Sequence, residues 1–187
     1  MANTDQPYGL RAVRTLSGGV VSTNEYTIAS GYAANIFSGD PVKLVAAGTL
    51  EIAAGAVTNA IGVFAGCSYV NADGEQVFKK YWPTGTVATN IKVSVYDDPD
   101  IIFAIQSDAT GVALADVGAH ADWEIVAGDV TVGVSKTNLD ASTAIGATQA
   151  GLRVLRIIDM PDNAPGAYAD VEVQMAQHAF NTVGAGI

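Results

Sequence analysis

Residues 61–82 constrain the fold more than any other stretch, because apolar side chains alternate on both sides of a turn sequence. Residues 71–74 (Asn-Ala-Asp-Gly) supply that turn, since small polar residues favour turns and Gly adopts positive φ without a steric penalty. A lone hairpin is only marginally stable in water, so other strands must cover this one. Strict alternation assigns one face of the first strand to Ile61, Val63, Ala65, Cys67 and Tyr69.

Phe64 is the one bulky residue on the opposite face of this predicted strand. It lies between Gly62 and Gly66, and glycine inside a strand marks a place where another backbone or a ligand approaches closely. We therefore expect another part of the protein to pack closely over the backbone here. If Phe64 belongs to the core, Phe64→Ala costs about 3–5 kcal/mol.

Composition and strand spacing favour a β-rich domain. The 187 residues suit one domain; 49% are hydrophobic, and 15% are charged, below the usual proportion of about a quarter. We predict an all-β fold, a single β-sandwich or barrel (jelly-roll-like) of roughly ten strands with extended terminal arms. Besides the hairpin, strands are expected at residues 42–45, 49–52, 91–96, 101–106, 130–134, 152–158 and 168–175, with a helical turn or ordered loop within 108–123.

The predicted organisation has three parts. An N-terminal arm and first strand occupy residues 1–22, a β domain residues 23–179, and a C-terminal tail residues 180–187. Residues 1–16 and 180–187 are candidate arms that become ordered on contact with a partner. On this hypothesis, removing residues 1–16 leaves the β fold intact and weakens partner binding.

The charge balance argues against several classes of partner. The formal net charge is −10, from 9 basic and 19 acidic residues. Nucleic acid is not expected as a partner, because neutralising phosphates requires Lys and Arg. An anionic membrane surface is disfavoured for the same reason, and the longest apolar runs, such as residues 101–105, are too short to cross a bilayer. Basic residues group only at Lys79-Lys80 and in the alternate pairs Arg11/Arg14 and Arg153/Arg156.

Cysteine usage and the N-terminus indicate that the chain stays in the compartment where it is made. Cys67 is the only cysteine, so an internal disulfide is impossible and secretion is not supported. We interpret Cys67 as a small buried hydrophobe rather than a nucleophile. The N-terminal residues lack the basic and apolar regions of a signal peptide.

Candidate chemical groups are scattered along the chain. His120 and His178 lie at no metal-ligand spacing from another His or Cys, and we interpret His120 as a polar loop residue near Asp122. The nucleophile-elbow, Ser-x-x-Lys and phosphate-loop patterns are missing from the sequence. Two aromatic residues, Tyr81 and Trp82, precede Pro83 and could form a contact platform for sugar or peptide. Such a pair more often closes the end of a β core.

The densest run of carboxylates is Asp97, Asp98 and Asp100 around Pro99. With Asp108 and Asp116 downstream, it could form a calcium site or a catalytic carboxylate pair. The alternating oxygen ligands and bend glycine of a calcium loop are missing, so we favour a simple strand-ending turn. We assign no catalytic, cofactor-binding or metal-binding residue, and we expect no enzymatic activity and no cofactor.

In their order along the chain and in their pattern of residues, four segments resemble the capsid decoration (cement) proteins of tailed bacteriophages. They are TNEYTIASGYAANIFSGDPVKL (residues 23–44), IGVFAGCSYVNADGEQVFKKYWP (61–83), VYDDPDIIFAIQSD (95–108) and LRVLRIIDMPDNAPG (152–166). The resemblance implies a small, β-rich, non-enzymatic viral structural protein on the outer capsid surface of a virion. It also implies that the chain is made in the host cytoplasm, bridges neighbouring major capsid subunits, and forms a homo-oligomer, a dimer or trimer.

Two other classes of function compete with this interpretation. A carbohydrate- or receptor-binding β module of a phage tail or spike would expose an aromatic cluster near Tyr81 and Trp82 in a shallow groove. A small β-sandwich enzyme would gather polar groups in a deep pocket. The enzyme hypothesis is the weakest, because the sequence offers no pair of nucleophile and base.

Overall fold

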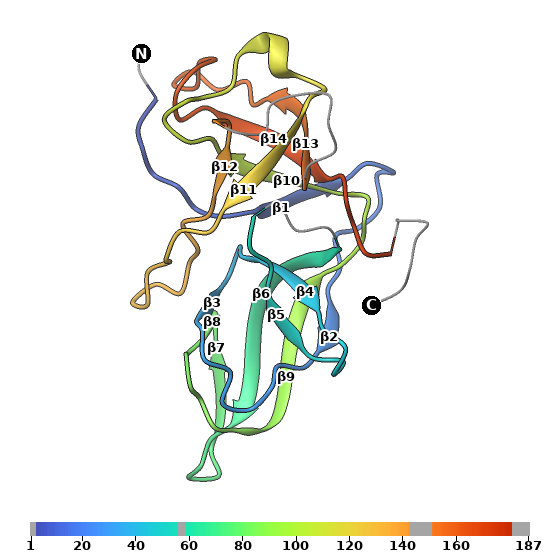
Figure 1. Ribbon diagram of the computed structural model, residues 1–187, viewed down its shortest axis with the longest axis vertical. Coiled ribbons are helices and arrows are strands. Elements are labelled where there is room, and N and C mark those ends of the chain that lie inside the picture. Colours follow the sequence, from blue (N-terminus) through green and yellow to red (C-terminus); the bar gives the residue numbers. More distant parts are fainter. Residues whose placement is uncertain (1–2, 56–58, 143–150, 181–187) are drawn as a thin grey trace.

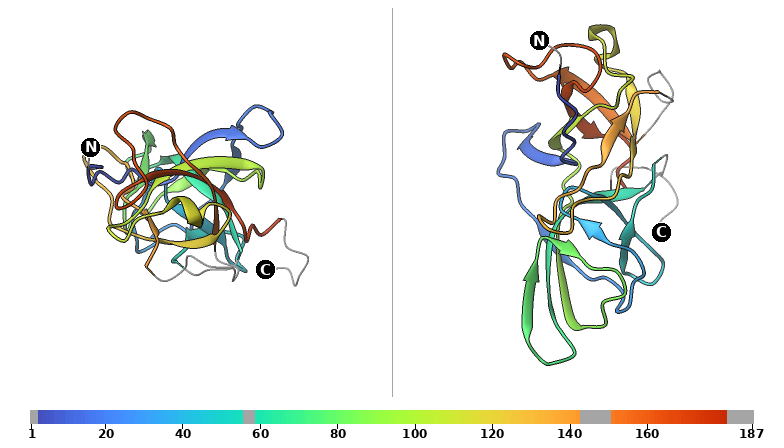
Figure 2. Two further views of the ribbon diagram at one scale, coloured as in Figure 1. Left: turned by 90° about the horizontal axis from the view of Figure 1, so that it is seen from above. Right: turned by 90° about the vertical axis from the view of Figure 1, so that its left-hand side faces the viewer.

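The computed structural model describes residues 3–55, 59–142 and 151–180. The predicted all-β class is confirmed, and the antiparallel sheets are compatible with a β-sandwich. The described residues form two lobes along the long axis of the molecule (Figures 1 and 2). The lower lobe contains β2 (Asn24–Tyr26), β3 (Ile36–Phe37), β4 (Pro41–Leu44), β5 (Leu50–Ile52), β6 (Ala60–Val70), β7 (Gln76–Lys79), β8 (Tyr81–Trp82) and β9 (Thr89–Tyr96). The upper lobe contains β1 (Arg11–Thr15), β10 (Ile101–Gln106), β11 (His120–Glu124), β12 (Asn138–Asp140), β13 (Leu152–Ile157), β14 (Asp170–Met175) and the short 3-10 helix η1 (Leu114–Asp116).

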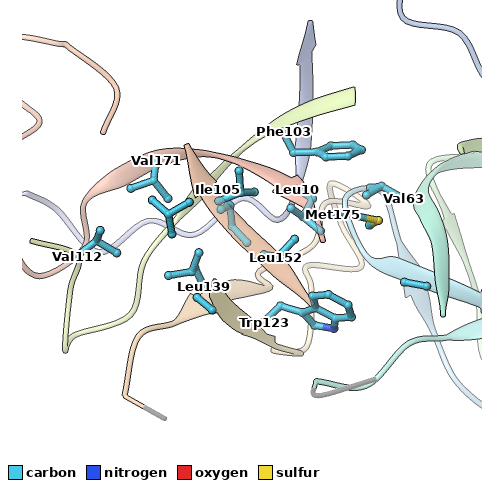
Figure 3. Close-up of a cluster of buried hydrophobic side chains, with 14 of the residues drawn as sticks. Leu10, Val63, Phe103, Ile105, Val112, Trp123, Leu139, Leu152, Val171 and Met175 are labelled. Atoms are coloured by element: carbon cyan, nitrogen blue, oxygen red, sulfur yellow. The ribbon is translucent and has the colours of Figure 1, made fainter. Parts of the chain in front are cut away.

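The upper lobe is built on a sheet with the strand order β1-β10-β14-β13-β11-β12. Strand β10 is buried along its whole length, as its continuous apolar run leads one to expect. Trp123 is 1% exposed, and its indole N–H donates to the carbonyl of Ala53 at 2.8 Å. The core of this lobe therefore also receives side chains from the lower lobe, among them Val63 (Figure 3).

The lower lobe is organised around β6, the longest strand. The sheet order is β2-β9-β6-β4-β5, and β7 pairs with the end of β6 beyond β4. The predicted β6–β7 hairpin is confirmed, but its return arm breaks after Lys79, and β8 pairs with β3 instead of continuing the hairpin. Trp82 thereby enters the core and meets Tyr69 edge-on at 5.3 Å between ring centroids.

The strict alternation predicted for β6 is wrong, because the strand is bulged. Its register shifts against β4 near Ile61 and against β9 at Ala65, and each extra residue moves the following side chains to the other face. Phe64 is consequently fully buried in the lower core, whereas Val63 packs in the upper core. The predicted close approach over the backbone is present, since a Cβ added at Gly62 would lie 2.0 Å from a neighbouring carbonyl oxygen.

The described part of the predicted N-terminal arm lies against the protein's own upper lobe. The Asn3 side-chain amide donates to the carbonyls of Ala164 and Ala167, both at 2.8 Å. Leu10 is 2% exposed and belongs to the upper core. Strand β1 follows and pairs with β10. Residues 181–187 of the predicted C-terminal tail lie outside the described residues.

The described residues contain fourteen strands, more than the roughly ten expected. The first strand predicted within residues 1–22 is β1, and the additional strands, among them β3, β11 and β12, are five residues long or shorter, too short to show a clear period in the sequence. Residues 130–133, expected in a strand, form a turn instead. An Asp129 carboxylate oxygen accepts the backbone N–H of Thr131 at 2.7 Å, and Gly133 has φ +77°, so the chain reverses here. The helical turn expected within residues 108–123 is η1.

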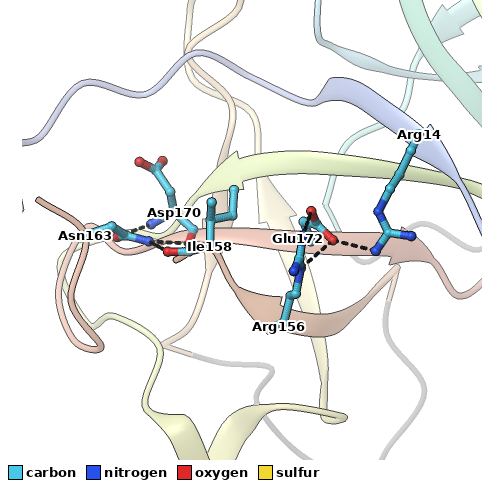
Figure 4. A network of polar contacts seen from close by, with 6 residues as sticks. All are labelled: Arg14, Arg156, Ile158, Asn163, Asp170 and Glu172. Carbon is cyan, nitrogen blue, oxygen red and sulfur yellow. Dashed lines mark hydrogen bonds and ion pairs between the residues drawn. The ribbon is translucent and has the colours of Figure 1, made fainter. Parts of the chain in front are cut away.

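A carboxylate on the outer face of the upper sheet joins three strands (Figure 4). Glu172 on β14 accepts hydrogen bonds from Arg156 on β13 at 2.6 Å and from Arg14 on β1 at 2.9 Å. The hydrogen bond from Arg156 is the main reason why the pKa of Glu172 lies below its ordinary value, with Arg14 adding to the effect. The two arginines cover the carboxylate, so its side chain is 4% exposed.

This network should make stability sensitive to acid. Because the pKa of Glu172 is lower in the folded state, its contribution is present above the ordinary glutamate pKa and is lost as pH falls through the folded value. We expect Glu172→Gln to lose about 1 kcal/mol at neutral pH, since both arginines are about half-exposed, and to converge with the wild type in acid. Urea unfolding at several pH values measures this difference. Glu25→Gln, which removes an exposed pair with Lys92, serves as the control and should change little; a pH-independent loss in Glu172→Gln would contradict the prediction.

Candidate functional site

The open face of the lower sheet carries a shallow trough of about 650 Å³. Its floor consists of small side chains on the central strands, because Gly66 on β6 pairs with Ser94 on β9 and Ser68 on β6 is flanked by Lys92 and Phe78. The opposite face of the same strands packs into the lower core through Val93 and Val95. Longer side chains form the two walls of the trough: Glu25 and Lys92 on one side, and Phe78 and Lys80 on the other.

The walls combine positive charge with an exposed aromatic ring. Phe78 is 77% exposed, although a phenylalanine ring is usually buried. Lys79, Lys80 and Lys92 line the trough, and Glu25 is the one acidic residue among its lining residues, at 3.1 Å from the Lys92 ammonium. In a chain with a net charge of −10, this trough is a local concentration of positive charge.

A second, smaller hollow continues from the trough. Lys79 and Lys80 also border a hollow of about 300 Å³ formed with the turn at residues 130–133. Val130 and Val132 in this turn are 57% and 56% exposed. Tyr81 lines the same hollow, with the Lys79 ammonium 5.3 Å from its ring centroid. We call the trough and this second hollow together the β7 surface.

A polar pocket of about 480 Å³ lies in the upper lobe, between the N-terminal segment and residues 160–170. The Tyr8 hydroxyl donates to a carboxylate oxygen of Asp170 at 3.0 Å. Burial, followed by the charge of Asp170, raises the pKa of Tyr8, and burial raises the pKa of Asp170. Tyr168 at the rim has φ +56°, an uncommon conformation for a tyrosine. No local pattern in the sequence predicts this pocket, because its lining residues come from both ends of the chain and from Gln106 on β10.

The carboxylate run at residues 97–100 forms the turn between β9 and β10, as predicted. An Asp98 carboxylate oxygen accepts the backbone N–H of Asp100 at 2.9 Å. Asp97 is 8% exposed and accepts hydrogen bonds from Asn24 and from the Tyr26 hydroxyl, the latter at 2.6 Å. The hydrogen bonds of these carboxylates thus hold the turn and the β2 edge. Across residues 3–55, 59–142 and 151–180, no three His, Cys, Asp or Glu side chains gather closely enough to hold a metal ion.

The other candidate residues from the sequence, His120, His178 and Cys67, do not come together in one site. His120 begins β11, so the prediction of a loop position is wrong. His178 is 1% exposed, and its Nδ1 accepts the backbone N–H of Phe180 at 3.1 Å. Cys67 is 7% exposed, and burial raises the pKa of its thiol to about 12, which supports its interpretation as a buried hydrophobe.

The aromatic pair expected to form a platform is divided between the core and the surface. Trp82 is 0% exposed and cannot contact a ligand on the surface. Tyr81 is half-buried and stacks on Phe37 with 5.4 Å between ring centroids. The exposed aromatic side chain of this region is Phe78, which the alternation of the hairpin did not distinguish from its neighbours.

A buried carboxylate at the junction of the lobes was missed in the sequence. Asp40, 1% exposed, accepts hydrogen bonds from the hydroxyls of Ser135 and Thr137 and from the backbone N–H of Phe37. Burial raises the pKa of Asp40, and the hydrogen bonds from Ser135, Phe37 and Thr137 oppose that rise. Because the bonded hydroxyls lie about a hundred residues further along the chain, only the fold brings them to Asp40. We interpret the cluster as a structural contact that holds the two lobes together, and we call Asp40 with Ser135 and Thr137 the joint.

Comparison of the chain with protein-family models, with curated protein sequences and with solved structures gives no match. In the described part of the chain, no helix has the length and apolar character needed to cross a membrane. Function therefore has to be inferred from the surfaces. The β7 surface is the candidate site, because it combines an exposed aromatic ring, exposed valines and concentrated positive charge.

Proposed function

We propose that this protein decorates and stabilises the outer surface of a phage capsid by bridging neighbouring major capsid subunits. It acts without catalysis or cofactor, as a homo-oligomer in the virion. The observation that carries the proposal is the presence of two separate exposed apolar surfaces on one elongated body. A bridging protein needs two such surfaces, one for each subunit it contacts.

The first contact surface is the β7 surface of the lower lobe. It is open rather than enclosed, and its apolar groups, Phe78, Val130 and Val132, are each more than half exposed. Exposed apolar groups rimmed by polar side chains are typical of protein interaction sites. An open surface of this kind suits a broad macromolecular contact better than a small substrate.

The second contact surface is the loop between β1 and β2. Leu16 is 57% exposed and Val20 is 90% exposed. The loop is held in place, because the backbone N–H of Leu16 donates to the Asp100 carbonyl at 2.8 Å and the Thr15 hydroxyl donates to the Gly19 carbonyl at 3.0 Å. Its apolar side chains are thus presented on an anchored loop, which lowers the ordering cost of binding. The outer edge of β1, the last strand of the upper sheet, lies beside it and suits strand addition.

The acidic balance of the chain fits the outside of the shell. A net charge of −10 favours solubility and opposes contact with packaged nucleic acid. Many identical sites on a capsid also supply avidity, so each contact can be weak. Weak contacts at the two apolar surfaces are then sufficient for stable decoration.

Binding to purified phage heads tests the proposal. We expect the protein to bind empty heads stoichiometrically and to raise the temperature at which they open. Phe78→Ala should weaken this binding by about tenfold or more, because exposed aromatic residues often dominate an interface. Leu114→Ala removes a side chain that is 73% exposed and outside both contact surfaces, so it serves as the control.

Three results would contradict the proposal. Heads that neither bind the wild-type protein nor gain heat resistance would exclude decoration. Equal losses in Phe78→Ala and Leu114→Ala would remove the β7 surface from the contact. Binding to a glycan array in place of heads would support the tail or spike hypothesis. That hypothesis requires an exposed aromatic cluster near Tyr81 and Trp82, and Trp82 is buried.

A further inference from the structure

The trough has the width of one extended polypeptide chain. Its floor follows β6, and its walls stand on the two neighbouring strands, β9 and β7. Neighbouring strands are about 4.8 Å apart, so the walls stand about 10 Å from each other, close to the spacing of packed sheets. Gly66 and Ser68 keep the floor low, and an extended segment can therefore approach the sheet closely between Lys92 and Phe78.

The charge of the trough selects an acidic occupant. Three lysines line it, and one of them is already paired with Glu25. Lys79 and Lys80 form no ion pair among the described residues. The Lys79 ammonium lies over the Tyr81 ring at the adjoining hollow, so a carboxylate can reach it there, next to Lys80. Carboxylates within one Debye length, about 10 Å, would interact with these lysines even though the rest of the protein is acidic.

The size of the positive patch argues against nucleic acid as the occupant. Binding of a nucleic acid depends on neutralising several phosphates in succession. The lower lobe offers three lysines here, and the net charge of the whole chain repels a longer polyanion. A short acidic segment requires only these contacts, and an apolar side chain on it can cover the exposed ring of Phe78.

We propose that the β7 surface binds an extended acidic polypeptide segment of the protein partner, with an apolar side chain against Phe78 in the trough and carboxylates against Lys80 and, at the adjoining hollow, Lys79. The inference rests on the proposed function in one respect: on a capsid, the segment belongs to the major capsid subunit. The binding of an acidic segment is independent of that assignment. The proposed function and the acidic-segment inference can therefore fail separately.

The experiment measures binding of short labelled peptides to the full chain by fluorescence anisotropy. One capped peptide of about eight residues alternates glutamate with valine and serine, so that its acidic side chains share one face of a strand. The matched peptide has glutamine in place of glutamate. We expect the acidic peptide to bind about tenfold more tightly at low salt, and the difference to shrink as salt rises.

Two charge-reversed variants separate a local contact from the overall charge. Lys79→Glu combined with Lys80→Glu should abolish the preference for the acidic peptide. Lys136→Glu combined with Arg153→Glu changes the net charge equally at two exposed positions that do not line the trough, and it should keep most of that preference. Thermal unfolding monitored by circular dichroism checks that both variants fold.

Several outcomes would overturn the inference. These are equal affinity for the two peptides, equal losses in the two variants, or tighter binding of oligodeoxythymidine or heparin than of the acidic peptide. A trough variant that loses the peptide but still binds heads would overturn the assignment of the segment to the capsid, while decoration itself would stand. If the wild type binds no heads yet keeps its lysine-dependent peptide preference, the proposed function fails and the chemistry of the trough remains.

Discussion

Phe64→Ala should lower the free energy of unfolding by about 3–5 kcal/mol, because it empties a fully buried aromatic site in the lower core. Phe64 lies on the central strand of its sheet, between β4 and β9. Its neighbours are held by strand pairing on both sides and cannot collapse far into the cavity. Chemical denaturation at neutral pH, followed by circular dichroism, measures the change.

Phe78→Ala is the matched control for this measurement. The same substitution is made in the same sheet, but at a ring that is 77% exposed. We expect its effect on stability to stay within about 0.5 kcal/mol, as for surface positions in general, while it weakens partner binding. A loss in Phe64→Ala as small as that expected for Phe78→Ala would show that Phe64 is not part of the rigid core.

The contrast between these two phenylalanines shows how far the sequence can predict the fold. Alternation located β6, β7 and the turn between them, because apolar periodicity and turn residues are local signals. It assigned the faces of β6 incorrectly, since a bulge adds a residue without changing local composition. The two glycines beside Phe64 were the usable signal, and they predicted the close backbone approach that the structure contains.

The candidate site was only partly predictable. The pair Lys79-Lys80 is visible in the sequence, but Lys92 and Glu25 reach the same trough from β9 and β2. Their meeting depends on the strand order, which alternation does not specify. The joint at Asp40 was missed for the same reason, because its partners are Ser135 and Thr137.

The N-terminal segment shows a different limit. A polar segment with Pro7 and Gly9 reads as an arm because it has no period, and residues 3–10 indeed contain no strand. Docking of such a segment depends on single contacts, such as the burial of Leu10, that a periodic pattern does not reveal. The docking of this segment on the upper lobe changes the expected result of removing residues 1–16.

Removal of residues 1–16 should destabilise the fold rather than leave it intact. It deletes β1 and so exposes the backbone edge of β10, it takes Leu10 out of the upper core, and it leaves Glu172 with Arg156 alone. The loss of Leu10 by itself is worth about 2–5 kcal/mol, and Leu10→Ala measures that part separately. We expect the truncated chain to lose more stability than Leu10→Ala in urea unfolding, because the strand pairing goes as well. If truncation left the unfolding midpoint unchanged while head binding fell, residues 1–16 would act as an independent arm that grips a partner, and their docking on the upper lobe would contribute nothing to the fold.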